Sequence, residues 1–294
     1  MRRPIIVVFL SLILMACQAL AAERGALFKV SGKGHTLYLY GTIHAGKPDY
    51  YPLEPRIAQA LAGASTLMLE VDLQGNPGAA QAAFSRHGLF APGSNALAAL
   101  PAERRARIED ALQRLGVAPG AMATYKPWVL VTMLAMLDLA KLGYDPALGV
   151  DLHLAKLARG KLRIGELESA QSQAALLDRL PLATQWLLLE EMLAQMASGR
   201  QLREMRELFD AYERADRQAF DAMLARLETD DSVGARFMRE VLLAERNGPI
   251  ADKLAALVTR EDHAVAAIGL LHLLGKGGVP ELLRARGWTV ERVY

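Results

Sequence analysis

The sequence predicts an α/β protein: a central mixed, largely parallel sheet built from both ends of the chain, with a large helical insertion. Short apolar runs bounded by glycine, of the kind that forms buried parallel strands, occur near both ends of the chain. Stretches with apolar residues at helical spacing fill most of the middle, about residues 75–260. Because no linker divides the chain, residues 22–294 are expected to form a single domain.

Residues 1–21 have the pattern of a secretory signal peptide. Arg2 and Arg3 precede an apolar run of 13 residues, and an A-x-A cleavage site follows at residues 19–21. A membrane span needs about 20 apolar residues, so this run is too short for an anchor. We therefore expect an exported, periplasmic protein. Residues 14–17 also resemble a lipobox, so an outer-membrane lipoprotein with a lipid anchor at Cys17 is the alternative.

Cysteine content and charge exclude several classes of protein. Cys17 is the one cysteine, so the mature chain has neither a disulfide nor a thiol nucleophile. The chain has 34 basic and 32 acidic residues, and the two counts become equal once Arg2 and Arg3 are removed. With no Lys/Arg block either, nucleic acid is not expected as a partner. No segment of the mature chain is apolar enough to span a membrane.

Five apolar runs are expected to form the strands, and they end at glycine or polar residues. They are residues 36–40, 65–69, 161–164, 264–268 and 288–293. The fifth follows a helix that Pro280 opens and Gly287 closes, as helix punctuation predicts.

Helical spacing marks most of the segments between the strands. The expected helices are residues 55–61, 102–115, 128–141 and 150–157, a long amphipathic stretch at 182–227, and residues 233–257. Residues 128–141 are apolar nearly all round, so this helix is expected to be buried.

The first four strands each run into a residue that can carry chemistry. His44 and His272 each stand three residues after a glycine, and Glu70 and Glu168 follow the other two strands. Ligands bind outside the carboxyl ends of parallel strands, so these side chains should converge if the strands are neighbours. Two imidazoles and two carboxylates suit a divalent metal of the zinc, manganese or cobalt type. Glu166 would point to the same face as Glu168, so one of the two is expected to turn inward.

Other chemistries have weaker support. Arg246 lies on an expected helix, where it could bind a substrate carboxylate or stabilise a developing negative charge. The chain has no phosphate-cradling glycine pattern, no G-x-S-x-G elbow and no H-E-x-x-H helix. The four remaining histidines are interpreted as surface or structural residues.

These motifs, in this order, resemble the TraB/GumN family, whose wider superfamily includes the Tiki metalloproteases and the erythromycin esterases. The resemblance covers about residues 25–294. Its segments are residues 39–44 (LYGTIH), 67–72 (LMLEVD), 125–128, 149–151, 165–173 (GELESAQSQ), 245–247 (ERN) and 269–288. The alignment of GELESAQSQ places Glu168, rather than Glu166, on the family's glutamate and Gln173 on its glutamine. The chain departs from the family after His272, where a proline is expected, and at the bulky Leu270 and Leu271, which should alter the pocket.

The resemblance implies an α/β fold with an active centre on the two Gly-x-x-His turns and the glutamates. The Tiki relatives imply a metal-dependent protease that uses manganese or cobalt. The leading hypothesis is therefore an exported metal-dependent hydrolase, peptidase-like, in which His44, His272 and Glu70 or Glu168 hold a Mn, Co or Zn ion. The remaining glutamate would be the general base and Arg246 an auxiliary catalytic group.

Two alternatives stay open. The esterase relatives imply a metal-independent hydrolase of a small ester or lactone, with histidine and glutamate as acid and base. A noncatalytic envelope protein linked to polysaccharide export would instead use the helical stretch 182–227 as its binding surface. The substrate, peptide or small ester, and the oligomeric state do not follow from the sequence.

Overall fold

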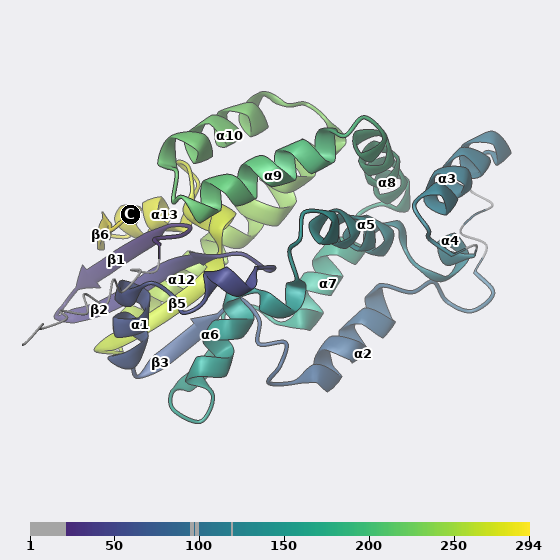
Figure 1. Ribbon diagram of the computed structural model, residues 1–294. Helices are drawn as coiled ribbons and strands as arrows, with labels where there is room; N and C mark the ends of the chain where they lie inside the picture. Colours follow the sequence, from purple (N-terminus) through teal and green to yellow (C-terminus); the bar gives the residue numbers. More distant parts are fainter. Residues whose placement is uncertain (1–21, 95–96, 98–99, 119) are drawn as a thin grey trace, which may run out of the picture.

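The computed structural model describes residues 22–94, 97, 100–118 and 120–294, so the expected signal peptide and Cys17 lie outside the described residues. A six-stranded sheet forms one side of the molecule, and many of the helices gather on the other (Figure 1). The strands are β1 (Leu27–Gly32), β2 (His35–Thr42), β3 (Thr66–Leu69), β4 (Arg163–Glu166), β5 (His263–Gly269) and β6 (Thr289–Arg292).

The strand order is β4-β3-β5-β2-β1-β6, so the two ends of the chain build adjacent parts of one sheet. The first four strands in this order are mutually parallel, whereas β1 is antiparallel to both β2 and β6. The predicted mixed, largely parallel α/β fold is therefore confirmed. In the register, Thr42 pairs with Gly269 and Leu69 pairs with Ala267 and Glu166, which brings four carboxyl ends to one edge.

Strand β1 was not predicted from the sequence. Its burial pattern alternates only in part, and it leads directly into a Gly-Lys-Gly segment that reads as a loop. Lys33 and Gly34 both have positive φ, 54° and 87°, which is the backbone of a two-residue hairpin turn. The hairpin pairs β1 with β2 along its whole length and places β1 beside β6.

Helices cover both faces of the sheet (Figure 1). Helices α1 (Pro55–Ala62) and α6 (Val150–Ala158) pack on one face, and α12 (Glu245–Val258) and α13 (Val279–Ala285) pack on the other. Residues 264–268 of the central strand β5 are at most 2% exposed, as expected for a strand covered on both faces.

The remaining helices lie on either side of β4 in the sequence. They are α2 (Pro77–His87), α3 (Ala102–Arg114), α4 (Ala121–Thr124), α5 (Pro127–Lys141), α7 (Ala170–Asp178), α8 (Leu182–Ala197), α9 (Arg200–Glu213), α10 (Arg217–Thr229) and α11 (Val233–Arg236). Short 3-10 turns occur at η1 (Pro48–Tyr50), η3 (Pro146–Leu148) and η5 (Leu270–Leu273), and η4 (Phe237–Ala244) is a π-helix that joins α11 to α12.

Two helical predictions need correction. The stretch 182–227 is three helices rather than one, because the backbone turns at Gly199 (φ 70°) and Ala215 (φ 49°). Helix α5 is not buried all round: Met133, Met136 and Leu137 are 37–41% exposed. Helices α2 and α7 were not predicted, and both begin at polar N-caps, Asn76 and Ser169.

No helix within the described residues is both long and apolar enough to cross a membrane.

Candidate active site

The four side chains expected at the strand ends come together with Arg246. His44, Glu70, His272 and Arg246 line a cavity of about 250 Å³ at the carboxyl edge of the sheet. Glu168 lies beside them, because its backbone N–H donates to the carbonyl of Glu70 (2.9 Å) and extends the pairing of β3 with β4. Glu166 faces away and accepts the backbone N–H of Asp72 (2.6 Å), so Glu168 is the glutamate that turns inward.

Arg246 holds the two carboxylates together. Its Nε donates to both oxygens of Glu168 (3.0 and 3.1 Å), and its Nη2 donates to Glu168 (2.5 Å) and to Glu70 Oε1. The three side chains are only 11–16% exposed, and charges this buried require partners. Gln173, which begins the second turn of α7, donates to Glu70 Oε1 (2.7 Å) and to Glu168 Oε2 (3.1 Å).

The second oxygen of Glu70 faces the histidines. Glu70 Oε2 accepts the backbone N–H of Gly269 (3.0 Å) and lies 4.0 Å from His272 Nε2. Burial alone would raise the pKa of Glu70, but the charges of His44 and Arg246 and the hydrogen bond from the backbone N–H of Gly269 outweigh it and lower the pKa to about 2. Glu70 is therefore ionised at neutral pH.

His272 is held in one tautomer by a neutral partner. Asn247 donates its Nδ2 to the carbonyl of Gly277 (2.8 Å), so its Oδ1 is the acceptor for His272 Nδ1–H (2.6 Å). His272 Nε2 is then unprotonated and faces Glu70. Burial lowers the pKa of His272 to about 4, because the ring is only 6% exposed.

His44 has a charged partner. Its Nδ1 lies 3.2 Å from Asp151 Oδ1, at the first turn of α6, and its ring is 62% exposed at the cavity. Desolvation by the surrounding walls lowers the pKa of His44, but the charge and hydrogen bond of Asp151 and the charge of Glu70 outweigh it. The result is a pKa of about 9, so the two imidazoles differ in charge at neutral pH.

Because Gly269 has no side chain, the region between the side chains of Glu70, His272 and His44 is left open. A methyl group built on Gly269 would lie 3.4 Å from Glu70 Oε2, 3.5 Å from His272 Cδ2 and 3.7 Å from His44 Nε2. Both histidines have Nδ1 fixed by an oxygen, the arrangement typical of metal-binding histidines. Two imidazole nitrogens and one carboxylate oxygen therefore suit a divalent metal in kind. As the side chains stand, the described part of the chain holds no group of three or more His, Cys, Asp or Glu arranged for a metal.

The cavity walls are apolar, and most of them come from the helices between β4 and β5. Leu208 lies on α9, Met238, Leu242 and Leu243 lie on the π-helix η4, and Leu270 and Leu271 follow β5. Thr42 lines the floor, and its Oγ1 is buried without a partner in the described structure. Such walls limit water, and one hydroxyl remains for a ligand.

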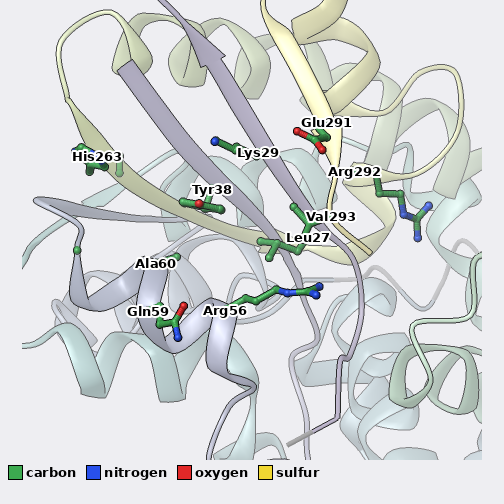
Figure 2. Close-up of a pocket in the computed structure, with 12 residues that line it drawn as sticks. Leu27, Lys29, Tyr38, Arg56, Gln59, Ala60, His263, Glu291, Arg292 and Val293 are labelled. Atoms are coloured by element: carbon green, nitrogen blue, oxygen red, sulfur yellow. The ribbon is translucent and has the colours of Figure 1, made fainter. Parts of the chain in front are cut away.

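A larger cavity lies away from these residues (Figure 2). It measures about 570 Å³ and lies between α1 and the strands β1, β2 and β6. None of the candidate residues lines it. Its Arg56 already pairs with Glu23 (2.6 Å), so the chemistry points to the smaller cavity.

Sequence reasoning found the central groups but assigned no role to three neighbours. Asp151 and Asn247 both fall within segments of the family resemblance, so the signal for them was present. Thr42 stands inside the first Gly-x-x-His turn, and nothing in the sequence shows that its hydroxyl is buried.

Comparison with known proteins agrees with the family resemblance found in the sequence. The model of the TraB/PrgY/gumN family matches residues 26–292. The chain is 28% identical over 258 residues to the uncharacterized protein YbaP of Shigella flexneri, covering 86% of this chain and 89% of that protein. It is 28% identical over 252 residues to the uncharacterized protein YbaP of Escherichia coli (strain K12), covering 84% and 87%. No solved structure matches the chain.

Proposed function

We propose that this chain, which belongs to the TraB/PrgY/gumN family, is an exported metal-dependent hydrolase that adds water to a carbonyl carbon, with a peptide bond as the leading substrate. One observation carries the proposal. His44 and His272 come from opposite ends of the chain, and both lie against the Gly269 space beside Glu70 Oε2. A purely structural role gives no reason for two imidazoles to share one carboxylate in a cavity.

The metal would be held by His44, His272 and Glu70. When bound, a divalent ion of the Mn, Co or Zn type lowers the pKa of water and polarises a carbonyl. Glu168 is then the carboxylate left to accept the proton of the attacking water. Arg246 orients both carboxylates and stabilises the negative charge that develops on the substrate. The hydroxyl of Thr42 is free to donate to a substrate oxygen.

A second candidate is the metal-independent esterase-like hydrolase. The observation that favours it is the contrast between the partners of the two imidazoles. The carboxylate of Asp151 faces His44 and raises its pKa to about 9, whereas burial beside the neutral Asn247 lowers the pKa of His272 to about 4. Neighbouring groups whose environments separate their pKa values can act as an acid and a base. In this mechanism His272 removes a proton from water, and His44 protonates the leaving group.

The test combines metal content with hydrolysis. We expect roughly one Mn, Co or Zn ion per chain in protein purified without chelator, and cleavage of an internally quenched peptide library that chelator abolishes. A His44→Ala, His272→Ala double variant should lose both the ion and the cleavage. His263→Ala serves as the matched control, because this exposed histidine at the start of β5 is outside the site.

The outcomes separate the candidates. Cleavage of a p-nitrophenyl ester that survives chelator but not the double substitution supports the metal-independent hydrolase. A double variant that hydrolyses like the wild type contradicts both. Full activity of the envelope system after both histidines are changed would favour the noncatalytic envelope protein.

A further inference from the structure

Helices α5 and α7 to α10, together with the π-helix η4, enclose a second cavity that adjoins the candidate active site; it is called the helical cavity below. It measures about 510 Å³, within the range of about 300–1,000 Å³ of small-molecule sites. Met238 and Leu242 of the π-helix η4 line both this cavity and the smaller one with the histidines. The π-helix therefore separates the two cavities, and none of its residues is fully buried. Segments of π-helix are frequent at functional sites.

The walls of this helical cavity are mainly apolar. They come from α5, α7, α8, α9, α10 and the segment 232–242, with side chains such as Trp128, Val131, Leu177, Leu188 and Met192. Methionines adapt to irregular ligands, because the side chain is unbranched and flexible. The exposed Met136 lies one turn after Thr132 on α5, so the apolar surface continues beyond the cavity rim.

The charged groups at the rim already pair with one another. Arg200 donates to Glu204 (2.6 Å) and to Asp230 (2.8 Å). Glu191 accepts from Gln195 (2.9 Å) and from the backbone N–H of Gly234 (3.1 Å). An ionic ligand would have to break these pairs. A peptide backbone would need partners for its own N–H and C=O groups along its whole length, and the uncharged polar side chains among the lining residues are only Thr132, Gln195, Gln201 and Ser232.

We propose that the helical cavity binds the hydrocarbon chain of an acylated substrate. The chain would lie against α5 and α8. The end that carries the bond to be hydrolysed would pass between the side chains of Met238 and Leu242 toward His44 and Glu70. The binding of the chain stands on the cavity alone, and the orientation toward the histidines rests on the proposed hydrolase function. The apolar walls provide the affinity, because each methylene of the chain that leaves water for the cavity strengthens binding.

Fluorescence of N-phenyl-1-naphthylamine, a neutral apolar probe, tests the binding. We expect the probe to bind the wild type and to be displaced by dodecanoic acid below its micelle concentration, but not by butanoic acid or by Leu-Leu-Leu amide. Ala135→Trp fills the cavity from α5 and should weaken binding of the probe by about tenfold. Ala140→Trp is the matched control, because Ala140 is exposed on the same helix and outside the cavity. Gln201→Trp, at the half-exposed rim on α9, should also weaken binding if Ala135→Trp fails to fold.

Equal probe affinity in the wild type and in a folded cavity-filling variant would overturn the proposal. Displacement by the tripeptide amide but not by dodecanoic acid would overturn the hydrocarbon-chain assignment. The double substitution of His44 and His272 should leave probe binding unchanged, so a failed hydrolase test and a failed binding test are distinguishable.

Discussion

The two histidines of the site differ in their partners, and this difference sets their charge. His272 donates to a neutral amide oxygen inside the core, whereas His44 faces the carboxylate of Asp151. The pKa values of about 4 and about 9 follow from burial in the first case and from a nearby charge in the second. At neutral pH the pair carries one positive charge opposite the ionised Glu70.

Asp151→Asn should lower the pKa of His44 from about 9 toward its ordinary value of 6.5, because the substitution removes the nearest negative charge. NMR titration of the imidazole in metal-free protein measures this directly. A raised folded-state pKa stabilises the fold fully below pH 6.5, and this contribution is lost as the pH rises through 9. The Tm of the wild type should therefore exceed that of the variant by the largest margin near pH 6.5, and the margin should shrink as the pH rises toward 9. Asp252→Asn, on the surface, is the control, and an unchanged His44 titration in Asp151→Asn would refute the assignment.

Gly269→Ala should strongly reduce activity without unfolding the protein. The added methyl group would occupy the space between Glu70 Oε2 and the two imidazoles, at 3.4–3.7 Å from their atoms. The backbone there has negative φ, so alanine causes no strain. We expect kcat/KM to fall by about 100-fold, with a Tm close to that of the wild type. Gly63→Ala, at the end of α1 with only an ordinary contact at 3.6 Å, should be active. Full activity of Gly269→Ala would show that the space is not used.

The central residues of the site were predictable because their type and position follow from a local rule. A polar residue after an apolar strand of a parallel sheet must lie at the carboxyl edge. The partners Asp151 and Asn247 lie on helices, so their contacts depend on how α6 and α12 pack and not on any local pattern. The same holds for Leu208 and Met238 in the cavity wall.

At the scale of elements, apolar periodicity predicted where helices occur better than where they end. The pattern at 182–227 continues across Gly199 and Ala215, because a turn of one or two residues leaves the apolar spacing nearly intact. Apolar residues all round predicted a buried α5, but its Met133, Met136 and Leu137 remain exposed, and the same helix contributes Val131 and Ala135 to the helical cavity. A helix can be rich in apolar residues because it is buried or because it forms a binding surface, so the composition of α5 alone did not separate these two outcomes.

The two helix breaks should respond to substitution in opposite directions. Ala215 has a φ of 49°, which costs a residue with a Cβ about 1–2 kcal/mol, so Ala215→Gly should stabilise the protein by about 1 kcal/mol. Gly199→Ala should destabilise it by about 1–2 kcal/mol, because φ there is 70°. Urea denaturation measures both free energies of unfolding. A destabilised Ala215→Gly would contradict the strain argument.

At the scale of the whole molecule, the site is a junction between three distant parts of the chain. Glu70 directly follows β3, Glu168 lies just after β4 and Arg246 lies in the first turn of α12, and the three charges meet with side chains at most 16% exposed. The buried apolar residues form two clusters: one joins the sheet to helices such as α1, α6, α9 and α12, and the other joins α3, α4, α5 and α8 to one another. The charged cluster adds a constraint on geometry, because each carboxylate must remain within reach of one guanidinium.

Arg246→Met should therefore destabilise the entire fold. Removal of one member of a buried ion network leaves uncompensated charge and costs about 3–5 kcal/mol. Arg246 also helps to lower the pKa of Glu70 to about 2, which stabilises the fold above pH 4.5 and is lost as the pH falls through 2. The difference in unfolding free energy between the wild type and Arg246→Met should be largest at neutral pH and should shrink as the pH falls below 4.5. Adding Glu168→Gln removes one of the stranded carboxylates, so the double variant should recover part of the loss at pH 7. Urea denaturation at pH 7 and pH 4 measures both effects, and a loss that is equal at the two pH values would show that Arg246 acts through packing and not through charge.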